Sequence, residues 1–216
     1  MKRSFFFILF LLPVISALAH TVNYDLEQAP AGDVISFYLP MGIEHIIPNG
    51  FDHILFVAGL CLLNARLKTI LWQATAFTAA HTISLALSMK GVVSLNAAIV
   101  EPLIALSILF VAVENLLLRE LKPWRIGLVF LFGLIHGLGF ASSLNEIGLP
   151  RNRFITSILS FNLGVELAQI IVILLVSGLL MYPFKQKSWH RRRIVYPASI
   201  FIACIAAYWT VERIIL

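Results

Sequence analysis

Six long apolar runs are the feature that most constrains this chain. A membrane-crossing helix needs about 20 mostly apolar residues, and five of the runs come close to or exceed that length. Hydrophobic residues make up 60% of the chain and charged residues 12%, against about 25% charged in a soluble domain. The sequence therefore predicts an all-α polytopic membrane protein, with a six-helix transmembrane domain over 50–216 that is surrounded by lipid. The runs cover roughly residues 50–65, 69–89, 92–118, 125–145, 154–181 and 194–212.

The N-terminus has the pattern of a secretory signal peptide over 1–19. Two basic residues precede an apolar run over 5–14, and the small-residue sequence ALA ends at Ala19. The shortness of the apolar run favours cleavage over a first transmembrane span. The mature chain would then begin at His20, whose α-amine and imidazole form a further candidate metal chelate. A periplasmic and interfacial segment over 20–49 would follow.

Basic residues are unevenly divided between the two sides of the predicted membrane domain. The segments 66–68, 119–125 and 182–193 contain ten Lys or Arg residues, and the segments on the other side contain four. The positive-inside rule places the ten in the cytoplasm. We therefore predict a multi-pass protein of the bacterial inner membrane with both mature ends in the periplasm. The sequence HRRR at 190–193 is interpreted as a retention and lipid-contact segment, so no nucleic-acid partner is predicted. The four Lys and Arg residues of the predicted periplasmic segments are Lys90, Arg151, Arg153 and Arg213.

Ionisable side chains recur at one depth in four different apolar runs. Each costs about 2.5–3.5 kcal/mol at the centre of a bilayer, and counting about 1.5 Å per residue puts them about 12–18 Å below the outer surface. A single buried histidine is more often a packing residue, but a shared depth predicts a polar cavity entered from outside. Asp52 and His53 are expected above this level, near the rim. The ionisable residues at the shared depth are His81, Glu101, His136 and Glu166. Supporting polar residues on the same helix faces are Thr78, Asn162 and Gln169.

Two pairs of runs resemble one another. VEPLIALSILFV at 100–111 and VELAQIIVILLV at 165–176 both open with Val-Glu, and each follows a run that bears a histidine. This pattern suggests a parallel duplication of helix hairpins, formed by spans two and three and by spans four and five. The sixth run has no ionisable residue in its core, so we expect it to be peripheral to the site.

The residue types favour particular metals. Imidazoles with carboxylates and amides bind borderline divalent ions such as nickel, cobalt or zinc. Thiolate and methionine clusters are missing from the sequence, which disfavours Cu(I), and the P-loop pattern for ATP is missing too. A His/Glu set could also relay protons across a membrane.

Five stretches together resemble the HupE/UreJ family of membrane proteins over nearly the whole mature chain. They are MGIEHIIPNGFDHILFVAGL, AAHTISLAL, VEPLIALSI, FGLIHGLGFA and FNLGVELAQ. The resemblance implies an association with hydrogenase and urease, which are nickel enzymes, and with their maturation factors. Some members are regarded as nickel or cobalt permeases. By position, His45, Asp52 and His53 would handle the metal. Six residues instead of five separate His45 from Asp52, and Gly139 stands where some permeases carry a glutamate.

Three functions remain open from the sequence. A permease that passes a divalent metal inward is the first, although its inner half offers only Glu114 and Asn115 as polar lining. An intramembrane metal-dependent hydrolase, with Glu101 or Glu166 as general base, is the second. The third is a membrane accessory or sensor protein without transport. A rhomboid-type serine protease is disfavoured because span six lacks a histidine. An enzyme is less favoured than a permease or an accessory protein. The sequence leaves homo-oligomerisation open.

Overall fold

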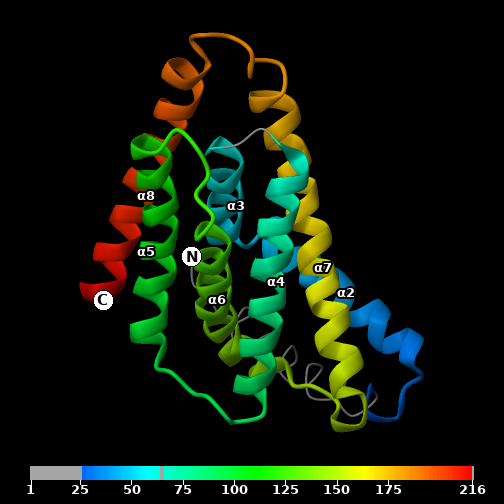
Figure 1. Cartoon of the computed structure of the whole chain (residues 1–216). Helices are drawn as coiled ribbons and strands as arrows, with labels where there is room; N and C mark the ends of the chain where they lie inside the picture. The colour runs from blue at the N-terminus through cyan, green and yellow to red at the C-terminus, as the bar shows by residue number, and fades with distance from the viewer. Residues whose placement is uncertain (1–25, 64–65, 216) are drawn as a thin grey trace, which may run out of the picture.

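Helices are the only regular elements in the part of the chain that this computed structural model describes, residues 26–63 and 66–215. The predicted signal peptide and His20 lie outside the described residues. Figure 1 shows the helices gathered into one bundle, with most of them running roughly along its long axis. In order, they are α2 (Ala31–Ile46), α3 (Phe51–Leu63), α4 (Leu67–Met89), α5 (Ala97–Leu117), α6 (Arg125–Ile147), η1 (Arg151–Arg153), α7 (Phe154–Val176), η2 (Ser177–Met181), η3 (Arg191–Val195) and α8 (Tyr196–Ile215).

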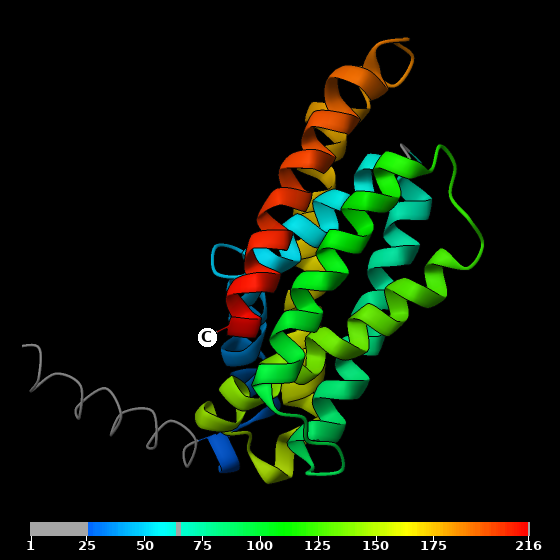
Figure 2. The same ribbon diagram turned by 90° about the vertical axis from the view of Figure 1, so that its left-hand side faces the viewer.

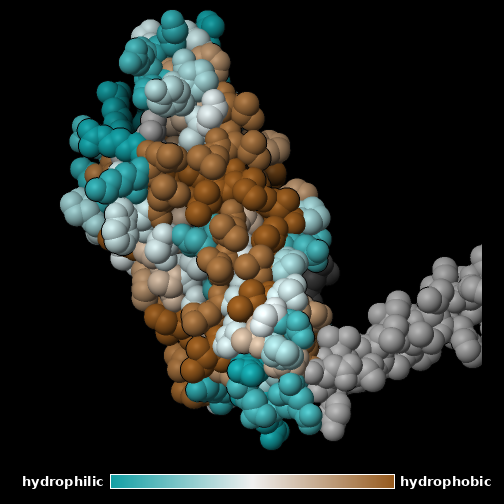
Figure 3. All heavy atoms as spheres, turned by 90° about the vertical axis from the view of Figure 1, so that its right-hand side faces the viewer, coloured by the Kyte–Doolittle hydropathy of each residue, from teal (hydrophilic) through white to brown (hydrophobic). Residues whose placement is uncertain are grey.

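The bundle has the helix lengths and apolarity of a multi-pass membrane protein. Within residues 26–63 and 66–215, five helical segments are long and apolar enough to cross a bilayer, namely α4, α5, α6, α7 with its flanking turns, and α8 with η3. A sixth crossing exists if the bent pair α2 and α3 counts as one span. Apolar residues cover the middle of the face in Figure 3, and hydrophilic residues gather at its two ends. The predicted all-α membrane fold is confirmed.

A bent pair of helices, α2 and α3, takes the place of the straight span expected at 50–65. α2 and α3 are bent by 68° at the break between Ile46 and Phe51. Backbone amides at the break keep hydrogen bonds: Ile47 N–H donates to Ile43 O at 2.8 Å, and Gly50 N–H donates to Ile46 O at 3.1 Å. Such a break is tolerated at membrane depth only where protein covers it. The expected span is therefore the shorter half of a broken pair.

Glycines let α2 pack directly on α7. A Cβ added to Gly42 would collide with the carbonyl oxygen of Phe161, and one added to Gly164 would collide with that of Leu39. The buried face of α2 includes Val34 and Tyr38. Residues 31–46, expected in a periplasmic and interfacial segment, therefore form a helix of the bundle.

The central contact of the bundle is between α4 and α6. Gly133 and Gly137 lie so close to α4 that an added Cβ would collide with the carbonyl oxygens of Phe77 and His81, respectively. α4 also packs on α7 and α6 on α5, while α8 packs along α5 (Figure 2). The parallel duplication of the hairpins α4–α5 and α6–α7 stays a prediction.

One end of the bundle carries most of the basic residues. α3 and α5 end there, α4 and α6 begin there, and the loop from α7 to α8 lies there too, at the top of Figure 1. We call it the basic end; the other end, near Lys90 and Arg151, is the opposite end. The basic residues of the basic end are Arg66, Lys68, Arg119, Lys122, Arg125, Lys185, Lys187, Arg191, Arg192 and Arg193.

Close packing of α2 on α7 predicts a difference between two glycine-to-alanine variants. Gly42→Ala should lower the free energy of unfolding by ~1–3 kcal/mol because the added methyl group has no space. Gly32→Ala, in the same helix but with no atom within 4 Å of an added Cβ, should leave stability unchanged or raise it by up to ~1 kcal/mol. Thermal unfolding in detergent measures both, and equal effects would contradict the packing.

Candidate metal site

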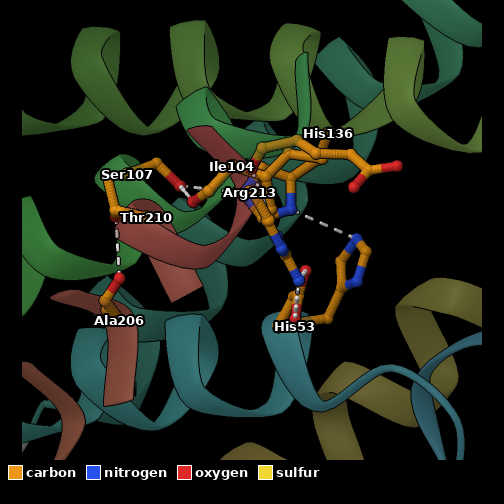
Figure 4. Close-up of polar contacts among 9 residues, drawn as sticks. His53, Ile104, Ser107, His136, Ala206, Thr210 and Arg213 are labelled. Carbon is orange, nitrogen blue, oxygen red and sulfur yellow. Dashed lines mark hydrogen bonds and ion pairs between the residues drawn. The ribbon is translucent and has the colours of Figure 1, made fainter. Parts of the chain in front are cut away.

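Four histidines from four helices meet inside the bundle. They are His45 on α2, His53 on α3, His81 on α4 and His136 on α6. The ligand atoms of the first three lie within 4.8 Å of one another. The Nδ1 atom of His136 lies 3.4 Å from Nε2 of His53; Figure 4 marks this contact with a dashed line. We call these four residues the histidine cluster.

The bend between α2 and α3 is what brings His45 and His53 together. In one continuous helix, eight residues would separate them by about 12 Å along the axis. Here the centroids of the two rings are 4.7 Å apart. The break therefore places the histidine before it and the histidine after it in the same site.

Asn162 on α7 orients the ring of His81. The Asn162 amide nitrogen donates to Ile158 O at 2.8 Å, which leaves the amide oxygen facing His81 Nδ1 at 3.0 Å. Because that oxygen can only accept, His81 Nδ1 carries the proton and donates it. The lone pair of His81 is then on Nε2, a buried atom without a hydrogen-bond partner. This arrangement is how proteins fix the ring of a metal-ligating histidine.

Ser107 on α5 orients His136 in the same way. Its hydroxyl donates to Ile104 O at 2.6 Å and lies 2.9 Å from His136 Nε2 (Figure 4). With its proton committed to the carbonyl, the hydroxyl accepts from His136 Nε2–H. The lone pair of His136 is then on Nδ1, the atom that faces His53. Both oriented histidines thus present an unprotonated nitrogen to the cluster.

The distances suit a transition metal. Two nitrogens bound at about 2.1 Å to one tetrahedral ion are about 3.4 Å apart, which is the His53–His136 separation. The ligand atoms of His45, His53 and His81 lie within 4.8 Å of one another. Two trans ligands of an octahedral ion are at most about 4.2 Å apart, so these side chains would move slightly inward to bind one ion. His45 Nε2, like His81 Nε2, is buried without a hydrogen-bond partner. Imidazole nitrogens suit nickel, cobalt, copper and zinc.

Aromatic rings enclose the histidine cluster. The centroid of the His45 ring lies 4.0 Å from that of Phe140, and the His136 and Phe77 centroids are 5.0 Å apart. Phe56 also lies against the His136 ring, and Phe161 against the His45 ring. This apolar wall leaves the imidazole nitrogens as the polar atoms that a bound ion would meet.

A cavity of ≈ 500 Å³ leads to the cluster. Its polar lining includes three of the four histidines, all but His81, and Asp52, Glu101 and Arg213. The guanidinium of Arg213 pairs with both oxygens of Asp52, at 2.9 and 3.2 Å, and donates to Glu101 O at 3.2 Å. An anion and a cation therefore share the mouth of the cavity, and the exposed Glu101 side chain stands beside them.

Glu166, Thr78 and Gln169 form their hydrogen bonds with residues outside the cluster. Glu166 accepts a hydrogen bond from the Thr75 hydroxyl at 2.7 Å, so it does not converge with the histidines as expected. The Thr78 hydroxyl donates to Gln169 at 3.1 Å, in the interior between α4 and α7. Of the three supporting residues, only Asn162 contacts a histidine of the cluster.

The expected rim position of His53 is wrong. Its ring centroid lies 5.9 Å from that of His81 and 4.9 Å from that of His136, so His53 is beside the deeper residues. The depth was miscounted because α3 begins at a break inside the bundle. Sequence reasoning also missed Ser107 and placed the helix of Arg213 at the periphery. Their roles depend on neighbours from other helices, which hydropathy does not report.

A known family matches nearly the whole chain. The sequence model of the family described as HupE / UreJ protein covers residues 19–213. The chain belongs to the HupE/UreJ family. No curated protein and no solved structure matches it. In this HupE/UreJ protein, the segment with His45, Asp52 and His53 that carried the resemblance is the bend itself, which gives that segment a structural role as well.

The hydrogen bond from His81 to Asn162 predicts an indirect effect on metal binding. Asn162→Leu should weaken Ni²⁺ binding by about 10–100-fold, because His81 loses the partner that fixes its ring and proton. Titration calorimetry on the purified HupE/UreJ protein measures the affinity. Asn152→Leu, on the exposed turn η1, is the control and should bind as the wild type does. Equal affinities for the two variants would contradict the orienting role.

The ion pair between Arg213 and Asp52 at the cavity mouth predicts that a second variant binds Ni²⁺ more tightly. Arg213→Gln removes a cation and frees Asp52, so Ni²⁺ binding should tighten by about 100-fold, because one charge about 10 Å from a divalent ion is worth about 3 kcal/mol at an effective dielectric constant of about 20. Arg151→Gln, exposed at the same end, should have little effect. Weaker binding by the Arg213 variant would show that Arg213 holds Asp52 in a binding position.

Proposed function

We propose that this protein is a permease that carries a divalent transition metal, nickel or cobalt, into the cytoplasm. The metal is its substrate: it enters the cavity between α3, α5 and α8 and binds the histidine cluster. It then leaves toward the basic end, which the positive-inside rule assigns to the cytoplasm. The observation that carries the proposal is the set of four imidazoles from four helices, two of them with a buried unpartnered Nε2.

Family membership supports the choice of metal. The family is associated with nickel enzymes, and imidazole-rich sites take nickel and cobalt ahead of calcium or magnesium. Neither described cysteine contributes to the cluster: Cys61 is buried elsewhere on α3, and Cys204 is exposed on α8. A site of nitrogen and oxygen donors favours divalent ions over Cu(I).

Polar groups on the inner side of the cluster favour transport over catalysis. The Thr78–Gln169 hydrogen bond lies about one helical turn from His81, and the buried Gln73 lies further along the same helix toward the basic end. A hydrolase would need no such continuation. The hydrolase remains the second candidate because Glu101 lines the same cavity as three histidines of the cluster, where a carboxylate could act as general base.

Metal uptake tests the proposal directly. In cells that lack other nickel importers, the wild-type chain should raise ⁶³Ni²⁺ uptake. His53→Ala and His81→Ala should reduce uptake to the background. Asp52→Ala should lower it, because Arg213 would then stand unpaired at the mouth and repel the cation.

The control is a histidine outside the cluster. His190→Ala, in the loop between α7 and α8 at the basic end, should transport as the wild type does. Normal membrane insertion of every variant is checked by detergent extraction and gel filtration. A wild-type chain that does not raise ⁶³Ni²⁺ uptake would refute the permease, and wild-type uptake by both cluster variants would refute the histidine cluster as its transport site. Hydrolysis of a model ester by the nickel-loaded protein would favour the second candidate.

A further inference from the structure

A buried ion pair lies near the basic end, apart from the histidine cluster. Arg125, the first residue of α6, has its Nη1 atom 3.1 Å from an oxygen of Glu114 on α5. The side chains are 2% and 4% exposed, respectively. Burying two charges costs several kcal/mol per ion unless good hydrogen bonds compensate, so the geometry of this pair matters.

The pair is close in space but poorly satisfied. Both Glu114 oxygens and the Nε, Nη1 and Nη2 atoms of Arg125 are buried without a hydrogen-bond partner among the described residues. A buried polar atom left unpaired costs about 1–3 kcal/mol, and more if it is charged. A pair built only for stability would be expected to align at least one hydrogen bond. The geometry leaves the carboxylate available to another cation.

Two amide side chains in this region also leave their oxygens unpaired. Asn115 uses its amide nitrogen to donate to Gly59 O at 2.8 Å, and Gln73 uses its own to donate to Thr69 O at 3.1 Å. Asn115 Oδ1 and Gln73 Oε1 are buried and unpartnered. Gln73 lines a cavity of ≈ 430 Å³ at the basic end together with Arg125.

Rigid helices connect this region to the histidine cluster. Along α4, Gln73 is eight residues from His81, or about 12 Å. Along α5, Glu114 is seven residues from Ser107, or about 10 Å. Along α6, Arg125 is eleven residues from His136, or about 16 Å. A shift of these helices that releases an ion from the cluster would therefore also move the ion pair.

We propose that Glu114, with the amide oxygens of Asn115 and Gln73, is a second, oxygen-lined cation site on the exit side, in which Arg125 serves as an internal counter-cation. This inference rests on the proposed permease. The divalent ion that leaves the histidine cluster displaces Arg125 from Glu114 and is passed to the basic end. When the ion departs, Arg125 returns and closes the route.

The test separates the exit site from a merely structural ion pair. The double variant Glu114→Gln/Arg125→Met removes both charges, so neither is left buried alone. It should bind Ni²⁺ at the histidine cluster within about 2-fold of the wild-type affinity, since the cluster is about 10 Å or more away. Its ⁶³Ni²⁺ uptake into proteoliposomes should fall by about 10-fold or more, because the route has lost its charged oxygen ligand.

A matched control and a second variant keep the result decisive if the double variant folds poorly. Arg119→Met/Glu120→Gln makes the same charge change at exposed positions of the basic end and should transport normally. Gln73→Leu conserves volume, so it should fold, yet lower uptake by about 5-fold through loss of one oxygen ligand.

The outcomes distinguish this inference from the proposed function. Wild-type uptake by Glu114→Gln/Arg125→Met, or by Gln73→Leu when the double variant does not fold, would overturn the exit site and leave the permease intact. A wild-type protein that neither binds nor transports Ni²⁺ would overturn both. Preserved binding with lost uptake, against a normal Arg119→Met/Glu120→Gln control, supports the exit site.

Discussion

The lack of water inside a bilayer is the constraint on which the rest of this structure depends. A break in a membrane-crossing helix exposes backbone groups that lipid cannot satisfy. The break between α2 and α3 is possible because its amides bond within the turn and because α2 packs against α7 through Gly42 and Gly164. In return, the break lets one crossing contribute two histidines to a single site. The site therefore depends on glycine packing as much as on its own residues.

Orientation of the rings follows from partners outside the cluster. Asn162 and Ser107 each have a second hydrogen bond that fixes which of their atoms faces a histidine. Because these partners come from α7 and α5, the site is completed only when α7 packs on α4 and α5 packs on α6. The phenylalanine wall adds an apolar surrounding in which few atoms besides the imidazole nitrogens could bind an ion. Packing and coordination chemistry are thus parts of one arrangement.

Charges are held in pairs at two levels of the bundle. Near the cavity mouth, Arg213 bonds to Asp52 with good geometry and partial exposure. Near the basic end, Arg125 and Glu114 are fully enclosed and poorly aligned. In both places, an arginine forms an ion pair with a carboxylate that would otherwise attract a metal ion. Each pair neutralises its carboxylate, and a divalent ion would compete for that carboxylate because it attracts an anion more strongly than a single charge does.

The sequence by itself determined the membrane fold, the placement of basic residues at one end and three of the histidines, in or beside the apolar runs, whereas His45 entered through the family resemblance. Hydropathy and loop charge report these features because each depends on local composition. Only the tertiary structure decided that residues 31–46 join the bundle, that His53 lies level with His81, and that Glu166 turns away to Thr75. It also assigned Arg213 to the cavity. These facts depend on which helix faces meet, and helix contacts are set by close glycine packing between residues far apart in the chain, which periodicity along one helix cannot reveal.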